Sequence, residues 1–582
     1  MRHANLRSHC DRVSVGGQGR GLMNRMFRGM MSASLALMVP LAPAIAAPAA
    51  LQAAPSMTTP TGSVRTHDGL VALYQQARKD VDFTVRNHVP DVSEAAMAAR
   101  QQAAQRAVAQ IGAIDDKAWP IPQRADLMLA LAEMRGVDFE HRVLRPWARD
   151  PSWWSTLDLG WGPKVKTAFS PPKLPITDAA AKATFAAQLR ATPTILANAR
   201  LTLTDARGDL IDLGIMHHDI ETRVYGRMAR DLAKHHPELV GPARAAEKAS
   251  SDFAAWLRAE KPRVKQHAGI GVADFDWYIK NVMLMPWTFA ELKALGEREW
   301  ERSMAFLALE EHEHKATPMP APVTSLEGFE ALRREADEDL LRFLKERRIM
   351  TVPDWLTVPP PEGPYVMPAN QDPAVPGPFD APIDRNFFRE AEDRDPRSLR
   401  AHNLPGHIFD SAYRKRDTRP IRGDERLGFI DSGRLEGWAF YLEEMLLQSG
   451  WLDDRPKARE IHYVLQANRG ARLKAELLAQ ANEWTFDQAL ESLSGRTPRW
   501  MEKTDDTAIY DMALYLRQPG LGLNYYFGKV QLEQLLAEER LAKGDDFDLT
   551  KFHDRFIQSG IIPIALIRWE MTGKDDQVRT MR

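Results

Sequence analysis

Apolar residues recur at helical spacing along most of this chain. Intervals of three and four residues relate Leu70, Leu73, Ala77 and Val81, and then Leu127, Ala130, Leu131 and Met134. Such spacing is typical of helices that bury one face. Further stretches with this pattern cover residues 180–203, 224–234, 243–257, 289–314 and 325–345. We therefore predict a mainly α fold.

Alternating apolar and polar positions, the pattern of half-buried strands, are scarce. The best short candidates lie at residues 201–204 and 209–215. Between Pro353 and Pro382 proline is so frequent that neither a helix nor a central strand can continue. We predict an irregular segment at 352–386. It is either a linker between two helical halves or a rim over a functional site, because long ordered loops are often functional.

The N-terminal residues follow a different pattern. A basic region precedes a short apolar run at 35–41, which ends in Ala44-Ile45-Ala46. This order predicts a secretory signal peptide over residues 1–46, with a buried helix or a retained membrane anchor as the alternative. A linker of small residues at 47–66 follows, and we expect residues 67–582 to form a single large helical domain.

Composition indicates a water-soluble body, with 27% charged and 44% hydrophobic residues. No later stretch approaches the ~18 apolar residues that a membrane span requires, so no stable membrane insertion is expected after signal cleavage. Acidic residues slightly outnumber basic ones, 79 against 77, which gives no electrostatic basis for binding nucleic acid. The only cysteine, Cys10, lies in the leader, which excludes a thiolate site. We expect a periplasmic or secreted protein, and the sequence indicates no oligomeric state.

Two motifs carry the candidate chemistry. The first, RAHNLPGHIFD at 400–410, contains His402 and His407, and the second, RLEGWAFYLEEM at 434–445, contains Glu436. Histidine and carboxylate ligands with one open position for water are what a zinc hydrolase requires. The two histidines are five residues apart, so a regular helix would separate them by roughly 140°. We therefore expect the backbone to turn at the intervening Pro-Gly step.

A purely structural interpretation competes with the metal site. His407 would then be a helix-cap or core histidine, and Glu436 would favour the start of its helix. The other histidines are weaker candidates for metal ligands, because adjacent residues on a helix point in different directions. Among them His312, beside Glu311, is the second choice for a site residue, ahead of the pair at 217–218. The sequence contains no phosphate-binding glycine loop and no GxSxG nucleophile motif.

These motifs resemble the domain of unknown function 885 family, whose pattern HExxPGHH followed by EGWAxYxE suggests a gluzincin-like metallopeptidase. The likeness extends to LRQPGLGLNYYFGK at 516–529 and to FDLTKFHDRFIQSGIIPIALIRWEMTG at 547–573. The resemblance covers most of the chain and is more specific in its C-terminal half. It implies a large zincin-like helical fold with few short strands, and zinc as the cofactor.

The resemblance also has departures. Ala401-His402 stands where the family pattern has His-Glu, so that one ligand and the presumed general base are missing in register, and Gln480 stands where a histidine is common. This motif, HNLPGH in place of HExxPGH, resembles that of a divergent branch of the family. His402 would act either as the replacement ligand or as the base. Glu443 and Glu444 are further candidates for the base, or simply line a solvated helix face.

The resemblance extends to substrate-contacting residues. His407 and Glu436 match metal ligands of the family. Tyr525 and Lys529 match the tyrosine and the lysine of its segment at 516–529, and Arg472 fits an arginine of the family. Tyr525 would donate a hydrogen bond to an oxyanion, or form part of an aromatic core. Arg472 would bind a substrate carboxylate or pair with an acid such as Glu476. Lys529, together with His312, is assigned to substrate binding.

The leading hypothesis is an exported metal-dependent hydrolase, a zinc peptidase that acts on small peptides or peptide-like amides. The alternative is a catalytically silent relative that only binds peptides. A third interpretation is metal-free hydrolysis by carboxylates around Glu436, Glu443 and Glu444.

Overall fold

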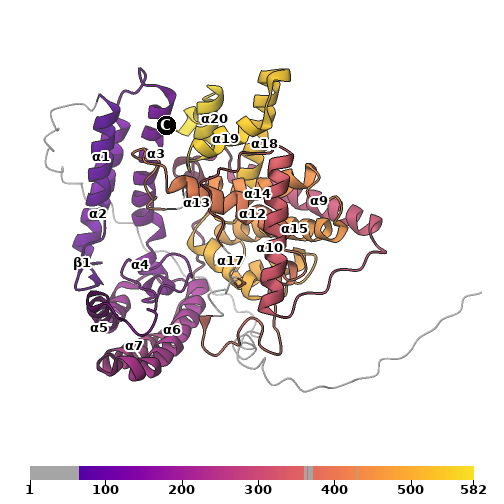
Figure 1. Cartoon of the computed structure of the whole chain (residues 1–582). Helices are drawn as coiled ribbons and strands as arrows, with labels where there is room; N and C mark the ends of the chain where they lie inside the picture. Colours follow the sequence, from indigo (N-terminus) through magenta and orange to yellow (C-terminus); the bar gives the residue numbers. More distant parts are fainter. Residues whose placement is uncertain (1–64, 360–362, 365–370, 429, 582) are drawn as a thin grey trace, which may run out of the picture. The chain divides into compact units, whose positions relative to one another are not determined.

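Helices make up most of the computed structural model, which describes residues 65–359, 363–364, 371–428 and 430–581 (Figure 1). This confirms the predicted mainly α fold. The first part of the chain forms α1 (His67–Asp80), α2 (Glu94–Gly112), α3 (Ile121–Phe139), α4 (Pro146–Arg149), α5 (Ala179–Thr202), α6 (Gly208–His235) and α7 (Val240–Glu260). The next helices are α8 (Val272–Asn281), α9 (Phe289–Glu313), α10 (Leu326–Glu346), α11 (Phe387–Glu392), α12 (Arg397–His402) and α13 (Phe409–Arg414).

The C-terminal helices surround the candidate site. They are α14 (Ser432–Gln448), α15 (Pro456–Gln480), α16 (Phe486–Arg496), α17 (Asp506–Arg517), α18 (Asn524–Lys543), α19 (Leu549–Gln558) and α20 (Ile564–Thr572). Two π-helical segments, η2 (Glu140–Leu144) and η7 (Asn403–Ile408), interrupt the α-helical ladder. The 3₁₀ turns are η3 (Pro151–Trp154), η4 (Pro237–Leu239), η5 (Lys261–Arg263), η8 (Gly544–Asp546) and η9 (Arg579–Met581).

The strands are β1 (Val85–Arg86) and β2 (Val89–Pro90), an antiparallel pair. Asn87 and His88 join them with φ of 50° and 62°, the left-handed values of a tight hairpin turn. The strands predicted at 201–204 and 209–215 are wrong. The first lies at the end of α5 and in the turn after it, and the second lies inside α6. Helix α6 packs against both α7 and η3, so its apolar residues cover more than one face and imitate a strand pattern.

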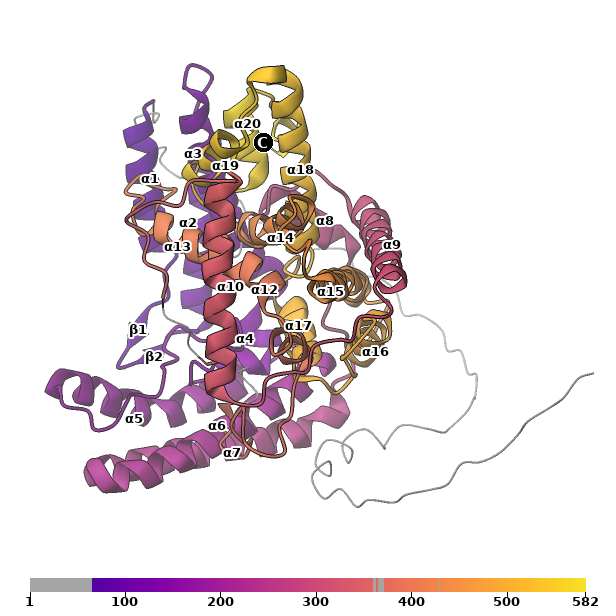
Figure 2. The same cartoon turned by 45° about the vertical axis from the view of Figure 1, so that its right-hand side comes forward.

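Helix α14 lies in the centre of the C-terminal part and packs against α12, η7 and α18 (Figure 2). Trp438, Phe440 and Leu442 are fully buried on it. Its polar residues Glu443 and Glu444 are also buried, at 1% and 5% exposure. The prediction that these two carboxylates line a solvated helix face is therefore wrong, because helices packed against α14 cover both side chains.

The proline-rich segment forms turns and bends without an α-helix or strand in its described residues. Asp372 accepts hydrogen bonds from Arg223 of α6 at 2.8 Å, and Gln371 donates to the carbonyl of Leu159 at 3.0 Å. Gln371 and Asp372 thus contact α6 and the loop that precedes α5. The described residues belong to one packed unit, whereas the predicted signal peptide and most of the predicted linker lie outside them. Within the described part of the chain, no helix is both long enough and apolar enough to span a bilayer.

Candidate metal centre

A π-helical segment brings His402 and His407 together. Helix α12 continues through η7 into α13 with right-handed helical backbone angles at His402 (φ −67°, ψ −50°) and at Phe409 (φ −63°, ψ −49°). A π-helix closes i→i+5 hydrogen bonds, so residues five apart lie on nearly the same face. The Nε2 atoms of the two histidines are 3.0 Å apart. The predicted turn at Pro-Gly is therefore wrong, because the helix widens there instead of breaking.

Pro405 and Gly406 explain the local structure. Proline has no N–H and cannot complete the α-helical ladder, which favours the wider register. A Cβ on Gly406 would lie 2.7 Å from Cβ and 2.9 Å from Cα of Ala439. Only glycine therefore allows η7 to approach α14 this closely. Ala439 lies one turn after Glu436, so this contact carries the carboxylate to the two imidazoles.

A second close crossing places Tyr525. A Cβ on Gly437 of α14 would lie 2.3 Å from Cα of Gly528 on α18, so the two helices meet backbone to backbone. Glu436 precedes Gly437, and Tyr525 lies one turn before Gly528. The Tyr525 ring stacks on the His402 ring, with centroids 6.0 Å apart and planes at 18°.

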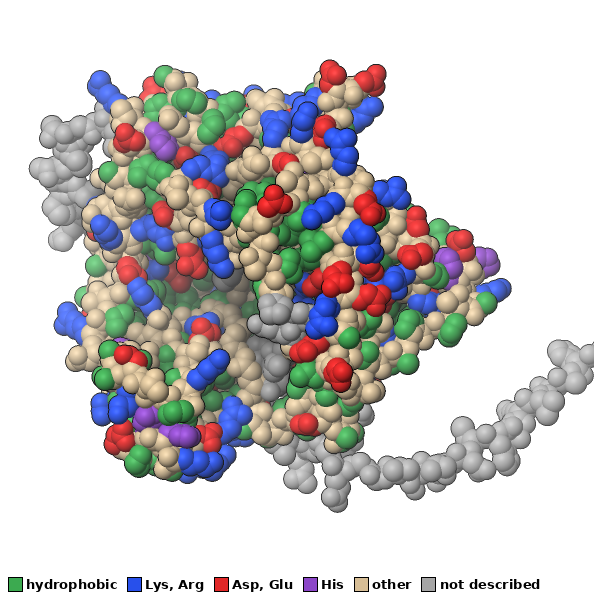
Figure 3. Space-filling model, viewed as in Figure 1, with side chains coloured by type: hydrophobic (Ala, Val, Ile, Leu, Met, Phe, Trp, Pro, Cys, Tyr) green, Lys and Arg blue, Asp and Glu red, His purple; other side chains and the backbone are tan. Residues whose placement is uncertain are grey.

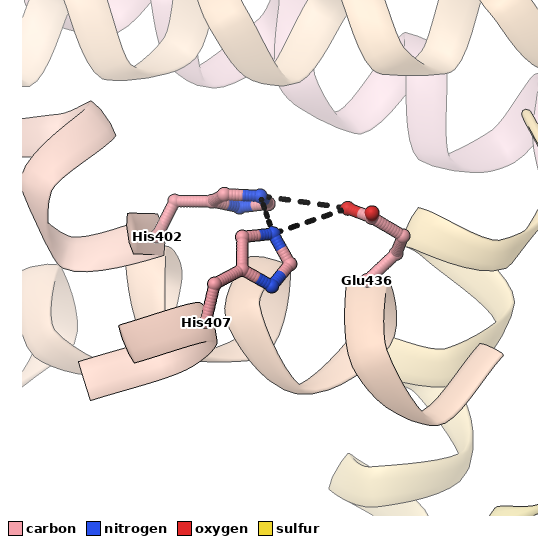
Figure 4. Close-up of side chains that lie close together, drawn as sticks. All are labelled: His402, His407 and Glu436. Atoms are coloured by element: carbon pink, nitrogen blue, oxygen red, sulfur yellow. Dashed lines mark hydrogen bonds and ion pairs between the residues drawn. The ribbon is translucent and has the colours of Figure 1, made fainter. Parts of the chain in front are cut away.

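His402, His407 and Glu436 form a three-membered cluster (Figure 4). Oε2 of Glu436 lies 3.5 Å from Nε2 of His402 and 3.6 Å from Nε2 of His407. Zinc ligands about 2.0–2.1 Å from the metal in a tetrahedron are about 3.3–3.5 Å from one another. The three atoms therefore fit three corners of such a site. The His407 side chain is 33% exposed and that of Glu436 is 21% exposed, so the cluster is open to small ligands.

Individual groups of the cluster also suit a bound cation. Oε2 of Glu436 is buried and accepts no hydrogen bond, an arrangement that normally calls for a cation or another donor. Burial would raise the pKa of the Glu436 carboxyl, but the two imidazoles outweigh burial and hold this pKa well below its usual range. Burial would lower the pKa of His407, yet Glu436 reverses that effect and raises it. A metal ion would thus compete with a proton on His407.

Glu443 lies against His402. Its Oε1 lies 2.9 Å from Nδ1 of His402 and 3.2 Å from a guanidinium nitrogen of Arg469. Burial opposes ionisation of Glu443, but Arg469 and His402 together lower the pKa of its carboxyl. An imidazole whose Nδ1 proton faces a carboxylate keeps the lone pair of Nε2 available for a metal. Such an arrangement suits His402 to the ligand role more than to the role of base.

Replacing Glu443 with glutamine should weaken zinc binding about 10- to 100-fold, because outer-shell carboxylates fix the tautomer and basicity of a ligand histidine. Zinc titration with a competing chromophoric chelator measures this affinity. Glu444→Gln is the matched control, since Glu444 is the next residue and contacts Arg302 and Lys529 instead of His402. Equal zinc affinity in the wild type and Glu443→Gln would contradict the orienting role.

A buried ion pair joins the two motifs. Arg434 donates to both carboxylate oxygens of Asp410, at 2.7 and 3.0 Å, and both side chains are buried. The pair ties α13 to α14 and so fixes the distance between the histidines and Glu436. Sequence analysis missed this pair, as it missed the pairing of Glu443 with Arg469. Opposite charges at the ends of the two motifs were the only available signal.

The other predicted site residues lie outside the three-membered cluster and have partners of their own or are exposed. Arg472 is buried near Tyr525 and forms an ion pair with Asp511 at 2.9 Å, not with Glu476, which accepts backbone N–H groups of the turn before α18. Lys529 is buried and contacts Glu444 and Glu533, each at 2.9 Å. His312 is exposed on the last turn of α9 and belongs to no candidate metal group of the described residues. Substrate binding by Lys529 and His312 stays a prediction.

Comparison with known proteins finds a family model that matches the part of the chain around the cluster. Residues 348–571 match the profile of a family described as a bacterial protein of unknown function, DUF885. This part of the chain is thus similar to the DUF885 family. The DUF885 region contains His402, His407, Glu436 and Tyr525, as well as Arg472 and Lys529. His312 lies outside it.

Solved structures resemble this chain along most of its length. One is a candidate lipoprotein of unknown function from Shewanella oneidensis, with 17% identity and a TM-score of 0.66, covering 87% of this chain and 100% of that one. Another is a candidate lipoprotein from Colwellia psychrerythraea, with 14% identity and a TM-score of 0.67, covering 88% of this chain and 99% of that one. At these identities the likeness concerns the fold. No curated protein matched the chain.

Proposed function

We propose that the chain is an exported, zinc-dependent hydrolase of small peptides or peptide-like amides. The convergence of His402, His407 and Glu436 carries this proposal, because three such ligands leave a fourth position for water. Zinc in such a site lowers the pKa of bound water and polarises a carbonyl group. Export is supported by the leader pattern at 1–46 and by structural neighbours described as candidate lipoproteins.

Protein groups around the cluster suit this chemistry. Burial and the negative charge of Glu436 raise the pKa of Tyr525 well above its usual value, so its phenol stays protonated and can donate to a developing oxyanion. The carboxylates of Glu443 and Asp511 are held by Arg469 and Arg472. Both acids are therefore already paired with arginines, and Glu436 stays assigned to the metal.

The electrostatic surface fits small substrates better than nucleic acid. On the face shown in Figure 3, basic and acidic side chains are interspersed, and no continuous basic surface is visible. Nucleic acid binding requires clustered Lys and Arg.

A second candidate function is peptide binding without turnover. The observation that favours it is Ala401-His402, which stands in place of the His-Glu of the family pattern, with Ala401 fully buried. The glutamate missing there is the residue that the chemistry normally uses as its base.

Metal analysis combined with peptide hydrolysis, before and after chelation, tests the proposal. We expect about one zinc ion per chain, loss of hydrolysis when the ion is removed, and recovery when zinc is returned. Tight peptide binding without turnover would support the silent relative instead. Hydrolysis that persists both after chelation and in His407→Ala would contradict the zinc-dependent function.

A further inference from the structure

Four arginines gather where η2, α4 and the start of α6 meet. Three of them, Arg142, Arg149 and Arg207, line a pocket of about 280 Å³, together with the backbone at Gly269 and the carboxylate of Asp274. None of these residues belongs to the candidate metal centre. The pocket-lining residues lie outside the DUF885 match, and the sequence analysis singled out none of them.

Arg149 is a buried cation without an acidic partner. It is 6% exposed, and its guanidinium donates to the carbonyl oxygens of Val143 at 2.8 Å and Ala268 at 3.0 Å. Its Nε is buried and has no hydrogen-bond partner. Among the described residues, no carboxylate forms an ion pair with it. Buried charges in proteins are normally paired, so this group calls for an anion from outside the chain.

The neighbouring charges do not supply that anion. Arg145 and Arg207 share the single carboxylate of Asp205, and Arg142 pairs with Asp138 at 2.6 Å. Burial lowers the pKa of Arg149 to about 10, and repulsion from Arg207 acts in the same direction. The carboxylates of Asp205 and Asp138 are thus already held by other arginines.

The backbone holds the arginines in place. Arg145 follows η2 in a left-handed conformation (φ 38°, ψ 56°), which reverses the chain so that Arg142 and Arg149 border the same pocket. Strained residues and π-helical turns cluster at functional sites. The opposite wall is fixed as well, since Ile270 N–H donates to Gln480 at 3.2 Å and a Cβ on Gly269 would lie 2.4 Å from a carbonyl oxygen of α15.

We propose that this pocket binds a small oxyanion, the phosphate or carboxylate group of a small ligand, between the guanidinium groups of Arg142, Arg149 and Arg207. Guanidinium groups match both oxyanions with paired hydrogen bonds. The pocket also lies at the N-terminal end of α6, whose helix dipole favours an anion there. The proposal is independent of whether the cluster at His402 binds a metal.

Calorimetric titration of the full chain with inorganic phosphate and, separately, with acetate tests the pocket, with sodium chloride holding the ionic strength constant. We expect saturable binding of at least one anion, with a dissociation constant on the order of 1 mM. Arg142→Gln should weaken it about tenfold, because a charge-assisted hydrogen bond is lost. Arg142 is partly exposed, so this variant should fold. Arg244→Gln, an exposed arginine of α7, is the matched control and should bind as the wild type does.

The two anions distinguish the sources of the ligand. Binding of phosphate alone supports a phosphorylated ligand, and binding of acetate alone supports a carboxylate. Binding of both supports the shared oxyanion chemistry. The absence of saturable binding for either anion would overturn the proposal, as would equal affinity in Arg142→Gln and the wild type.

Discussion

Replacing Gly406 with alanine should dismantle the candidate metal centre without touching any ligand. The new Cβ would lie 2.7 Å from Cβ and 2.9 Å from Cα of Ala439, so η7 has to move away from α14. That movement separates His402 and His407 from Glu436, which lies one turn before Ala439. We expect overpacking to cost about 1–3 kcal/mol of unfolding free energy. Zinc affinity should fall at least about 100-fold, more than outer-shell changes cost.

Gly495→Ala is the control for Gly406→Ala. Gly495 lies in α16, where a Cβ meets nothing within 4 Å, so alanine should leave stability unchanged or raise it slightly. Urea denaturation gives the free energy of unfolding for each variant, and competitive titration gives the zinc affinity. Wild-type zinc affinity in Gly406→Ala would show that the close contact of η7 with α14 does not hold the cluster together.

The sequence predicted several of the helices that precede the proline-rich segment, because their apolar positions recur at intervals of three and four. Residues 289–314 and 325–345 correspond closely to α9 (Phe289–Glu313) and α10 (Leu326–Glu346). Strand prediction failed at 209–215 because a helix buried on several faces loses its clear period. The real hairpin is only four residues long outside its turn, too short to give an alternating pattern.

The members of the cluster were predictable from residue types, whereas the way they meet was not. Five-residue spacing is incompatible with a regular helix, so a turn at Pro405 was the natural expectation. A π-helical register depends on which hydrogen bonds the surrounding fold permits, and the spacing of side chains does not reveal it. Gly406 contributes through a contact with Ala439, thirty-three positions away, which no local pattern indicates.

The roles of Glu443 and Glu444 could not be predicted from the sequence for the same reason. Glu443 and Glu444 followed a helical pattern that is equally typical of a solvated face. Their partners come from other helices, Arg469 from α15 and Lys529 from α18. Burial of a carboxylate is tolerated only when such a partner is present, and partners distant in sequence become visible only in the folded chain.

Substituting His407 with alanine should abolish stoichiometric zinc binding, the largest effect that we expect from any single change. Loss of a ligand should cost more than the roughly 10- to 100-fold that outer-shell changes cost. In the wild type, zinc at about 100 times its dissociation constant should stabilise the fold by about 2.7 kcal/mol. Thermal denaturation with and without zinc should show this stabilisation in the wild type and none in His407→Ala. His312→Ala, an exposed histidine of α9, is the matched control and should retain it.

The pH dependence of zinc binding gives a second measurement on the same variant. Because Glu436 raises the pKa of His407, the metal must displace a proton from that imidazole as the pH falls through this pKa. Zinc affinity in the wild type should therefore decrease steadily with decreasing pH, and the decrease should be shallower in any residual binding by His407→Ala. Unchanged zinc stoichiometry in His407→Ala, together with the same pH profile as the wild type, would show that the metal binds elsewhere and would remove the basis of the proposed hydrolase.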